Sequence, residues 1–390
     1  MCRLIPNKHN FYPNRHETAA ELLAALPAAA SPMYAITSLE SYEGHRSFLT
    51  PQRPDKKTRI MAILNATPDS FSDGGKYLES YDLSQPDSTA HNSPGISSSS
   101  PTESPPRSPT SQLRYEGINK VINYSAAPGR PLSIIDVGGQ STAPGAPEVT
   151  VEEETARVVP AIEHIKSAPI TRLVSIDTYR ASVAKAALNA GADIVNDVSA
   201  GTLDPEMLST VAEAGCPYIL MHMRGTPATM NKLTSYPNGL IPTIATELLE
   251  RVEAAEAAGI YRWRILLDPG IGFAKNAQQN LEILRNFNQL RNWPGLENFP
   301  WLVASSRKGF IGKITGMEEP WQRGMGSMVA VAAAIQGGAD IVRVHDLKIA
   351  AQTVKMADAI WRGWDPKEKK VTAKELERAT QEETGSTSVS

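Results

Sequence analysis

Eight short runs of aliphatic and β-branched residues recur along this 390-residue chain, and their spacing constrains the fold more than any other feature. Each run is apolar without a polar face, which is typical of a parallel strand buried on both sides. The runs cover 59–65, 132–139, 172–179, 193–200, 217–223, 264–272, 301–309 and 340–346. Helical patterns separate most of them, over 150–167, 180–191, 204–215, 241–259, 277–290 and 321–338. This alternation predicts an α/β fold, a (β/α)8 TIM barrel.

The patterned span defines the expected domain organisation. It runs from about 58 to 362 and, without an insertion, is close to the roughly 250 residues of such a barrel. Residues 80–110 are about half Ser and Pro, which predicts a disordered insertion in the loop after the first strand. Residues 1–57 form an N-terminal extension or linker, and 363–390 form a polar tail. A doubly wound open sheet is the alternative fold, but no strand end is followed by a dinucleotide-binding glycine motif.

Charge and cysteine content exclude several classes of protein. The net charge is −3, from 39 basic and 42 acidic residues, which argues against nucleic acid or an anionic membrane as the main partner. Two cysteines, Cys2 and Cys216, provide neither a disulfide framework nor a cysteine metal site. A cytoplasmic location fits, although Arg3, Lys8 and Arg15 in an acid-free N-terminus leave a mitochondrial presequence as the alternative.

Polar side chains stand at the carboxyl end of almost every predicted strand. In a barrel these ends converge on one face, where the active sites of this fold lie. Together the residues predict a functional pocket, although a single Asp at a strand end is more often a helix cap or loop clamp. Asp136 and Asp197 are candidates for that structural role, and His222 is interpreted as a packed core histidine. The set comprises Asn65, Asp136, Asp177, Asn196, Asp197, His222, Asp268, Ser306, Arg307, Lys308, Arg343 and His345.

The chemistry of these side chains indicates two parts of a ligand. Asp177, Asn196 and Asp268 suit a flat heterocycle with an amino group beside a ring N–H, because a carboxylate accepts two parallel hydrogen bonds. Lys308 would meet a ring acceptor. The second group, Asn65, Arg343 and His345, suits a phosphate or diphosphate, with or without Mg²⁺. The sequence shows no nucleophile paired with a base and no zinc-ligand spacing, so positioning and electrostatics are expected to carry the chemistry.

Motifs at these strand ends resemble, in order and at suitable spacing, those of the dihydropteroate synthase family. They are MAILNATPDSFSDGG (61–75), DVGGQSTAPGA (136–146), SIDTYRASVA (175–184), NDVSAG (196–201), MHMRGTPATM (221–230), LDPGIGFAK (267–275), SRKGFIG (306–312) and RVHD (343–346). The resemblance covers about 58–362 and is specific because it rests on the whole set. It implies a pterin-binding barrel that joins 6-hydroxymethyl-7,8-dihydropterin diphosphate to p-aminobenzoate, giving 7,8-dihydropteroate and diphosphate with Mg²⁺.

The same resemblance assigns roles to individual residues. Asp177 and Lys308 would be catalytic, and the pterin would be held by Asp177, Asn196, Asp268 and Lys308 in a pocket lined by Met223 and Phe273. Asn65, Arg343 and His345 would hold the diphosphate and its metal, with Asn65 as the metal ligand. Phe71, Ser141, Thr142 and Pro144 would close over the p-aminobenzoate, whose carboxylate would lie near Ser306. The family also implies a homodimer. The arylamine is neutral at pH 7, which fits the lack of a dedicated base.

Three further interpretations stay open at this point. Pterin-binding methyltransferase domains resemble this family and are the enzymatic alternative. Ala143 stands where the family commonly has arginine, so a catalytically impaired pterin-binding scaffold is the non-enzymatic alternative. In fungi this synthase resembles the last part of a longer folate-synthesis polypeptide, and residues 1–57 look like the end of such an upstream region.

Overall fold

The computed structural model describes residues 57–66, 117–124, 132–142, 146–168 and 172–364. Within them, eight parallel strands form one sheet in the order β6-β5-β4-β3-β2-β1-β8-β7. An isolated parallel bridge from Leu267 to Trp301 brings β6 beside the segment that enters β7, so the sheet closes on itself. The strands are β1 (Arg59–Asn65), β2 (Leu132–Gly138), β3 (Leu173–Asp177), β4 (Ile194–Asp197), β5 (Tyr218–Met221), β6 (Ile265–Asp268), β7 (Leu302–Val303) and β8 (Ile341–Val344). The predicted TIM barrel is therefore confirmed.

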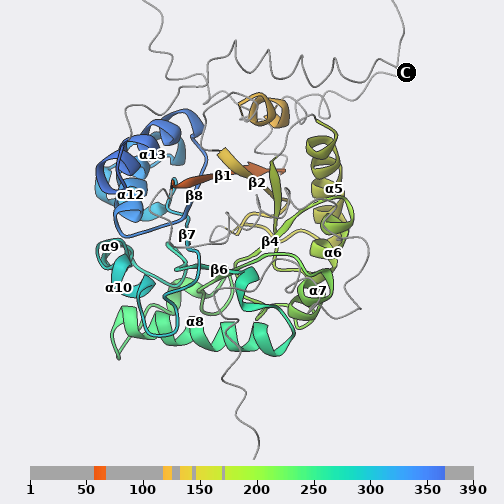
Figure 1. The fold of residues 1–390 in the computed structure, drawn as a ribbon, viewed down its shortest axis with the longest axis horizontal. Coiled ribbons are helices and arrows are strands. Elements are labelled where there is room, and N and C mark those ends of the chain that lie inside the picture. Colours follow the sequence, from red (N-terminus) through yellow and green to blue (C-terminus); the bar gives the residue numbers. More distant parts are fainter. Residues whose placement is uncertain (1–56, 67–116, 125–131, 143–145, 169–171, 365–390) are drawn as a thin grey trace, which may run out of the picture.

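A ring of helices surrounds the strands (Figure 1). The helices are α5 (Val151–Ser167), α6 (Ala181–Asn189), α7 (Met207–Ala214), α8 (Leu240–Ala257), α9 (Ala277–Arg285), α10 (Phe287–Arg291), α11 (Gly309–Thr315), α12 (Gly324–Gln336) and α13 (Leu347–Trp361). Residues 117–124 are also helical. The helix predicted over 277–290 is divided at Asn286, which caps α9 and precedes α10. The Ser/Pro-rich insertion, residues 1–56 and residues 365–390 lie outside the described residues.

Several strands are shorter than the apolar runs predicted, and β7 shows why. The run over 301–309 continues past Val303, but β7 ends there. Arg307 then takes a left-handed conformation with φ +61°, which turns the chain away from the barrel. The polar residues of this run consequently lie on a loop beyond the strand, where Ser306 contacts His345 and Arg307 pairs with Asp346.

The barrel interior is closed by one apolar layer. Each strand contributes one side chain to it, namely Met61, Ile134, Leu173, Ile194, Ile219, Leu266, Leu302 and Ile341, and Leu173 alone among them is only partly buried. A second and larger apolar cluster fills the space between the strands and the helices. Because strand side chains alternate with a period of two, the next inward positions lie two residues further along each strand. Those positions include Asp136, Asn196, Asp268 and Arg343, which belong to the candidate site above the apolar layer.

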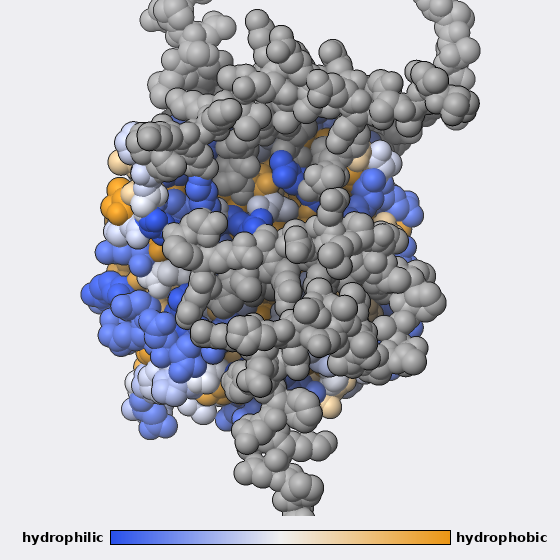
Figure 2. Space-filling view, viewed as in Figure 1, coloured by the Kyte–Doolittle hydropathy of each residue, from blue (hydrophilic) through white to orange (hydrophobic). Residues whose placement is uncertain are grey.

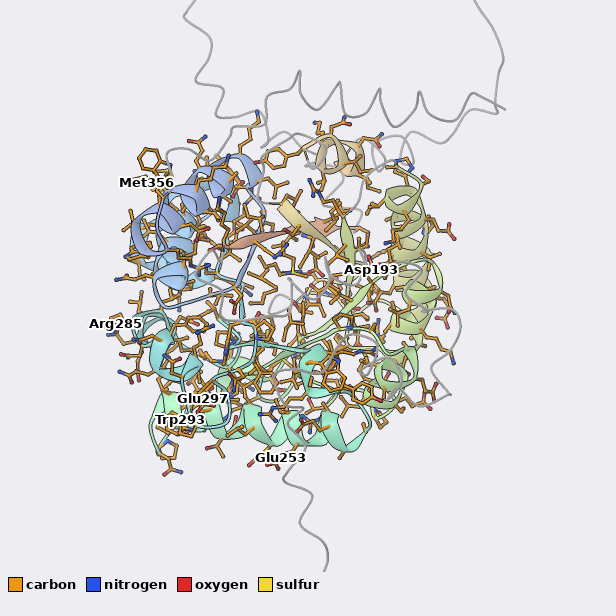
Figure 3. All side chains as sticks on the ribbon, in the orientation of Figure 1. Asp193, Glu253, Arg285, Trp293, Glu297 and Met356 are labelled. Atoms are coloured by element: carbon orange, nitrogen blue, oxygen red, sulfur yellow. The ribbon has the colours of Figure 1, made fainter. Side chains whose placement is uncertain are left out.

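The outer surface belongs to the helices. Glu253, Arg285 and Met356 point away from the barrel in Figure 3. The parts of this face that the described residues form are mostly hydrophilic, with hydrophobic side chains scattered between charged ones (Figure 2). Among the described residues, no helix combines the length and the hydropathy needed to cross a membrane.

Candidate active site

Arg343 and two carboxylates occupy the centre of the layer above the apolar floor. Its Nε donates to Asp136 Oδ2 at 2.6 Å, and its Nη2 donates to Asp177 Oδ2. Asn196 Nδ2 donates to the same oxygen of Asp136 at 3.1 Å. These residues come from β2, β3, β4 and β8. The centre of the site is thus a guanidinium clamped between two acids.

Asp136 corrects an expectation from the sequence. It was a candidate for a cap or clamp, but it lies two residues after Ile134 of the apolar layer and therefore points into the barrel. Its Oδ1 is buried and has no hydrogen-bond partner within the described part of the chain. Asp197, three residues after Ile194, points outward instead. As expected, it clamps a loop by accepting bonds from Ser199 and from the Tyr218 hydroxyl.

Burial moves the pKa values of Asp177, Asp268 and Lys308 toward neutrality. Desolvation raises the pKa of Asp177 to about 7, with Arg343 opposing the shift and Asp136 adding to it. Desolvation also raises the pKa of Asp268 to about 6, against the bond from Gly270 N. The pKa of Lys308 falls to about 8, through desolvation first and then repulsion by Arg343. A ligand that offers N–H donors to the acids would favour their charged forms.

An apolar wall stands beside these polar groups. Met223 and Phe273 pack in one cluster with Val198, Met221, Met230, Ala274 and Tyr179. Lys308 Nζ lies 4.3 Å from the centroid of the Phe273 ring. Asp268, at the end of β6, accepts a bond from Gly270 N at 2.7 Å. The structure therefore brings acceptors, a lysine and a flat apolar surface together, which is what an aromatic heterocycle with polar edges requires.

The predicted phosphate-binding residues His345 and Arg343 have different surroundings in the structure. Ser306 Oγ meets His345 Nδ1 at 3.1 Å and accepts a bond from the His345 N–H at 3.3 Å. Desolvation and the cations Arg307, Arg343 and Lys308 depress the pKa of His345 well below its usual value, so its imidazole is neutral. The Arg343 guanidinium instead lies between Asp136 and Asp177, and Asp177 is one of the residues predicted to bind the pterin.

Asn65 and the loop residues complete the set of predicted positions. A Cβ placed on Gly138 would lie 3.8 Å from both Asn65 Oδ1 and Asp177 Oδ2, so these two oxygens flank the same glycine. Ser141 is exposed and Thr142 half-buried at the start of the loop after β2. Phe71, Ala143 and Pro144 lie outside the described residues.

Sequence reasoning missed two members of the site. Asp136 was set aside as structural, although its place at a strand end was noted. Lys275 was not selected at all, and it is buried behind Phe273, where it contacts His222. The signal for Lys275 was its position at the end of the LDPGIGFAK motif, since a lysine in an otherwise apolar loop needs a buried partner.

Comparison with known proteins places this geometry in a class. The family model described as "Pterin binding enzyme" matches residues 128–345. Dihydropteroate synthase of Synechocystis sp. is 42% identical over 307 residues, which cover 79% of this chain and 91% of that protein. The folic acid synthesis protein fol1 of Pneumocystis carinii is 43% identical over 305 residues, 78% of this chain. The fold is thus that of a pterin-binding barrel, and the chain belongs to the dihydropteroate synthase family.

Solved structures agree with this placement. The dihydropteroate synthase of Xanthomonas albilineans, solved in complex with 7,8-dihydropteroate, matches with a TM-score of 0.59 and 32% identity, over 79% of this chain and 95% of that one. The Yersinia pestis enzyme, solved with a sulfonamide drug complex, matches with a TM-score of 0.61 and 32% identity, over 78% and 94%. The chain spans 36% of the Pneumocystis carinii protein and 41% of the Schizosaccharomyces pombe one.

Proposed function

We propose that this chain condenses 6-hydroxymethyl-7,8-dihydropterin diphosphate with p-aminobenzoate to form 7,8-dihydropteroate and diphosphate. The observation that carries the proposal is the layer of Asp136, Asp177, Asn196 and Asp268 beside the Met223–Phe273 wall. Relatives support it, since one Xanthomonas albilineans synthase structure contains 4-aminobenzoic acid and another contains 7,8-dihydropteroate.

The pterin would lie with its ring against Phe273 and its polar edge toward the acids. Asp177 and Asp268 would accept bonds from ring N–H and amino groups, and Asn196 can both donate and accept. Lys308 Nζ lies over the Phe273 ring and would donate a hydrogen bond to an acceptor atom of the pterin. A ring held on its face and on its edges is fixed in orientation, which places its methylene carbon toward the rim.

In the reaction, the bond from the methylene carbon to the diphosphate oxygen breaks, and the electron pair leaves with the diphosphate. Positive charge then develops on the pterin, where the Asp177 carboxylate would stabilise it in a site of low polarity. The lone pair of the arylamine nitrogen forms the new C–N bond. Its proton passes to solvent or to the departing diphosphate, so no side chain has to act as a general base.

The diphosphate would lie at the rim near Asn65, Arg343 and His345. Asn65 offers an amide oxygen, the hard ligand that Mg²⁺ accepts, close to an oxygen of Asp177. No cluster of three metal-binding side chains exists among the described residues. The described residues therefore suit a Mg²⁺ ion that would be held mainly by diphosphate oxygens and water, as is usual for this ion. When bound, the ion would neutralise charge on the leaving group.

Product analysis tests the proposal. We expect purified protein, supplied with the pterin diphosphate, p-aminobenzoate and Mg²⁺, to release diphosphate and dihydropteroate in equal amounts. A sulfonamide should compete with p-aminobenzoate and leave pterin binding intact. Methyl transfer from methyltetrahydrofolate without dihydropteroate would indicate the methyltransferase alternative. Normal pterin binding without diphosphate release would indicate the impaired scaffold.

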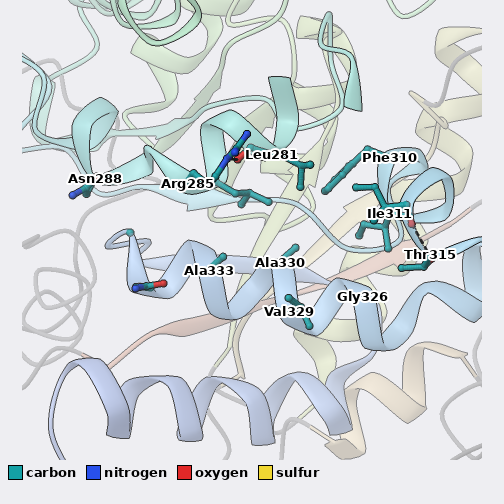
Figure 4. Close-up of a pocket in the computed structure, with 14 residues that line it drawn as sticks. Leu281, Arg285, Asn288, Phe310, Ile311, Thr315, Gly326, Val329, Ala330 and Ala333 are labelled. Atoms are coloured by element: carbon teal, nitrogen blue, oxygen red, sulfur yellow. Dashed lines mark hydrogen bonds between the residues drawn. The ribbon is translucent and has the colours of Figure 1, made fainter. Parts of the chain in front are cut away.

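A second copy of the chain is the partner that we propose for an apolar groove of about 700 Å³ among α9, α11 and α12 (Figure 4). Leu281, Phe310 and Ile311 line it, and its rim exposes Ile314 by 55% and Val329 by 71%. An exposed apolar surface of this kind marks an interface more often than a free surface. The family resemblance also implies a homodimer.

We expect Val329→Asp to convert the dimer to a monomer, because the second copy would then bury an unpaired carboxylate against an apolar surface. Light scattering coupled to size-exclusion chromatography measures the mass directly. Trp263→Asp is the control, since Trp263 is 54% exposed but lies in the turn before β6, away from the groove. A wild-type monomer, or a Val329→Asp dimer, would contradict the proposed interface.

The cellular location stays a prediction, with the cytoplasm first and the mitochondrion as the alternative. Among the relatives, one folate synthesis bifunctional protein of Pisum sativum and one of Arabidopsis thaliana are named mitochondrial. We propose the same two compartments for this chain. Imaging of the full-length chain fused to a fluorescent protein at its C-terminus distinguishes them.

A further inference from the structure

The loop over 268–275 includes Asp268 and Phe273, two residues predicted to contact the pterin. Its backbone conformation depends on contacts with neighbouring residues. Ala274 adopts φ +50°, which is unfavourable for a residue with a Cβ. Gly270 adopts φ +69°, and a Cβ there would lie 2.0 Å from the His222 carbonyl oxygen. The loop is therefore pressed against His222 at the end of β5. Its shape is fixed by contacts and not by local preference.

Lys275 supplies one of these contacts from a buried position. Its Nζ donates to the Phe273 carbonyl oxygen at 2.9 Å and lies 2.9 Å from His222 Nδ1. On the other side of the ring, His222 Nε2 lies 2.8 Å from Glu247 Oε2 on α8. Desolvation and the charge of Lys275 lower the pKa of His222 to about 4, so the imidazole is neutral at pH 7. Nδ1 then accepts from Lys275, and Nε2–H donates to Glu247.

Glu247 supports the loop by a second route. Arg224 Nε donates to both carboxylate oxygens of Glu247 at 3.0 Å, and its guanidinium lies 4.2 Å from the centroid of the Tyr236 ring. The Tyr236 hydroxyl donates to the Ala274 carbonyl oxygen at 3.0 Å. Although burial opposes it, the bonds from His222 and Arg224 lower the pKa of Glu247 to about 2. Two adjacent carbonyl groups of the loop are thus braced through one carboxylate.

The braced segment connects directly to the residues that would hold the pterin. The ring of Phe273 is the surface over which Lys308 Nζ lies. A Cβ on Gly272 would meet Lys308 Cδ at 3.1 Å, so the stem of Lys308 packs on this loop. A shift of the Phe273 carbonyl group would also move the Phe273 ring, and Lys308 Nζ would lose its contact with that ring. Among the described residues, none of those expected to bind p-aminobenzoate takes part in the network.

We propose that Lys275 and His222, anchored by Glu247, are positioning residues that hold the loop over 268–275 in its pterin-binding shape. They act through Phe273, Asp268 and Lys308 and do not touch the reacting atoms. The inference rests on the proposed function, because it concerns the pterin side of that site. It predicts that damage to the network weakens pterin binding selectively.

The test compares pairs of variants. Lys275→Met removes the Nζ hydrogen-bond donor and keeps the length of the side chain, while His222→Leu removes both ring nitrogens. We expect each to raise the Kd of the pterin diphosphate about ten- to a hundredfold, the effect of losing a hydrogen bond to a charged group. The KM for p-aminobenzoate should change less than about twofold, since no described residue of the network is among those expected to bind this substrate. Isothermal titration calorimetry measures pterin binding without turnover.

Two controls separate positioning from folding. His222→Gln retains an acceptor and a donor, so it should restore most of the pterin affinity that His222→Leu loses. Lys185→Met, on the exposed side of α6, should leave binding unchanged. Unchanged pterin affinity in Lys275→Met, or equal weakening of both substrates, would overturn the proposal. Failure of the proposed function is distinct, since wild-type protein would then yield no dihydropteroate at all.

Discussion

Replacing Asp177 by asparagine is expected to lower kcat about 10²- to 10³-fold while the barrel stays folded, because the variant loses the carboxylate placed to stabilise charge on the pterin. Asparagine has nearly the same shape, and Arg343 retains its bond to Asp136 at 2.6 Å. Steady-state kinetics with both substrates measures the loss, and circular dichroism checks the fold. A rate within threefold of the wild type would show that the charge of Asp177 contributes little.

The pH dependence of the same variant provides an independent check. Desolvation raises the pKa of Asp177 to about 7, so its charged form disappears as the pH falls through neutrality. If the carboxylate is the active form, wild-type kcat/KM for the pterin diphosphate decreases below about pH 7. In Asp177→Asn this limb should be absent or strongly reduced, leaving a flatter profile. An unchanged acidic limb in the variant would assign the titration to another group, with Asp268 the next to examine.

Arg343→Met is expected to lower the free energy of unfolding by about 3–5 kcal/mol, the cost of removing one partner from a buried ion pair. Asp136 is fully buried, and its Oδ2 would lose the guanidinium and keep only the bond from Asn196. Although burial opposes it, Asp136 and Asp177 raise the pKa of Arg343, so the guanidinium remains charged in the wild type. Urea denaturation followed by fluorescence measures the loss.

A double variant isolates the physical cause of that loss. Asp136→Asn combined with Arg343→Met removes the uncompensated charge, so it should be more stable than Arg343→Met alone. Turnover should remain low in the double variant, because the site still lacks the Arg343 guanidinium. A single variant as stable as the wild type would mean that solvent reaches Asp136 when the arginine is absent.

The fold and the chemical class of the ligand could be predicted from the chain alone because both depend on local patterns. All eight strands fall within the predicted apolar runs. Asp177, Asn196, Asp268 and Lys308 were selected because polar side chains at strand ends have no use in an apolar core. The strand lengths were overestimated, as at β7, because an apolar pattern does not register a left-handed turn such as that at Arg307.

The hydrogen-bond partners of the site residues could not be predicted from the sequence. Asp136 and Asp197 show the reason. Both follow an apolar run, yet Asp136 faces the barrel interior and Asp197 faces a loop, because they lie two and three residues beyond the apolar layer. One residue of register separates a site residue from a loop clamp. That register follows from the closed sheet, and the sequence pattern does not reveal it.

The sequence by itself determined the barrel, the face that carries the site and the types of group available there, since strand periodicity and residue chemistry are written along the chain. Tertiary structure decided which groups meet. Barrel closure sets β8 beside β1 and brings Arg343 to Asp136, 207 positions away. It likewise sets Lys275 against His222, 53 positions away, with Glu247 behind. Hydrogen bonds and ion pairs act over a few ångströms, so such pairs exist only once the sheet has closed.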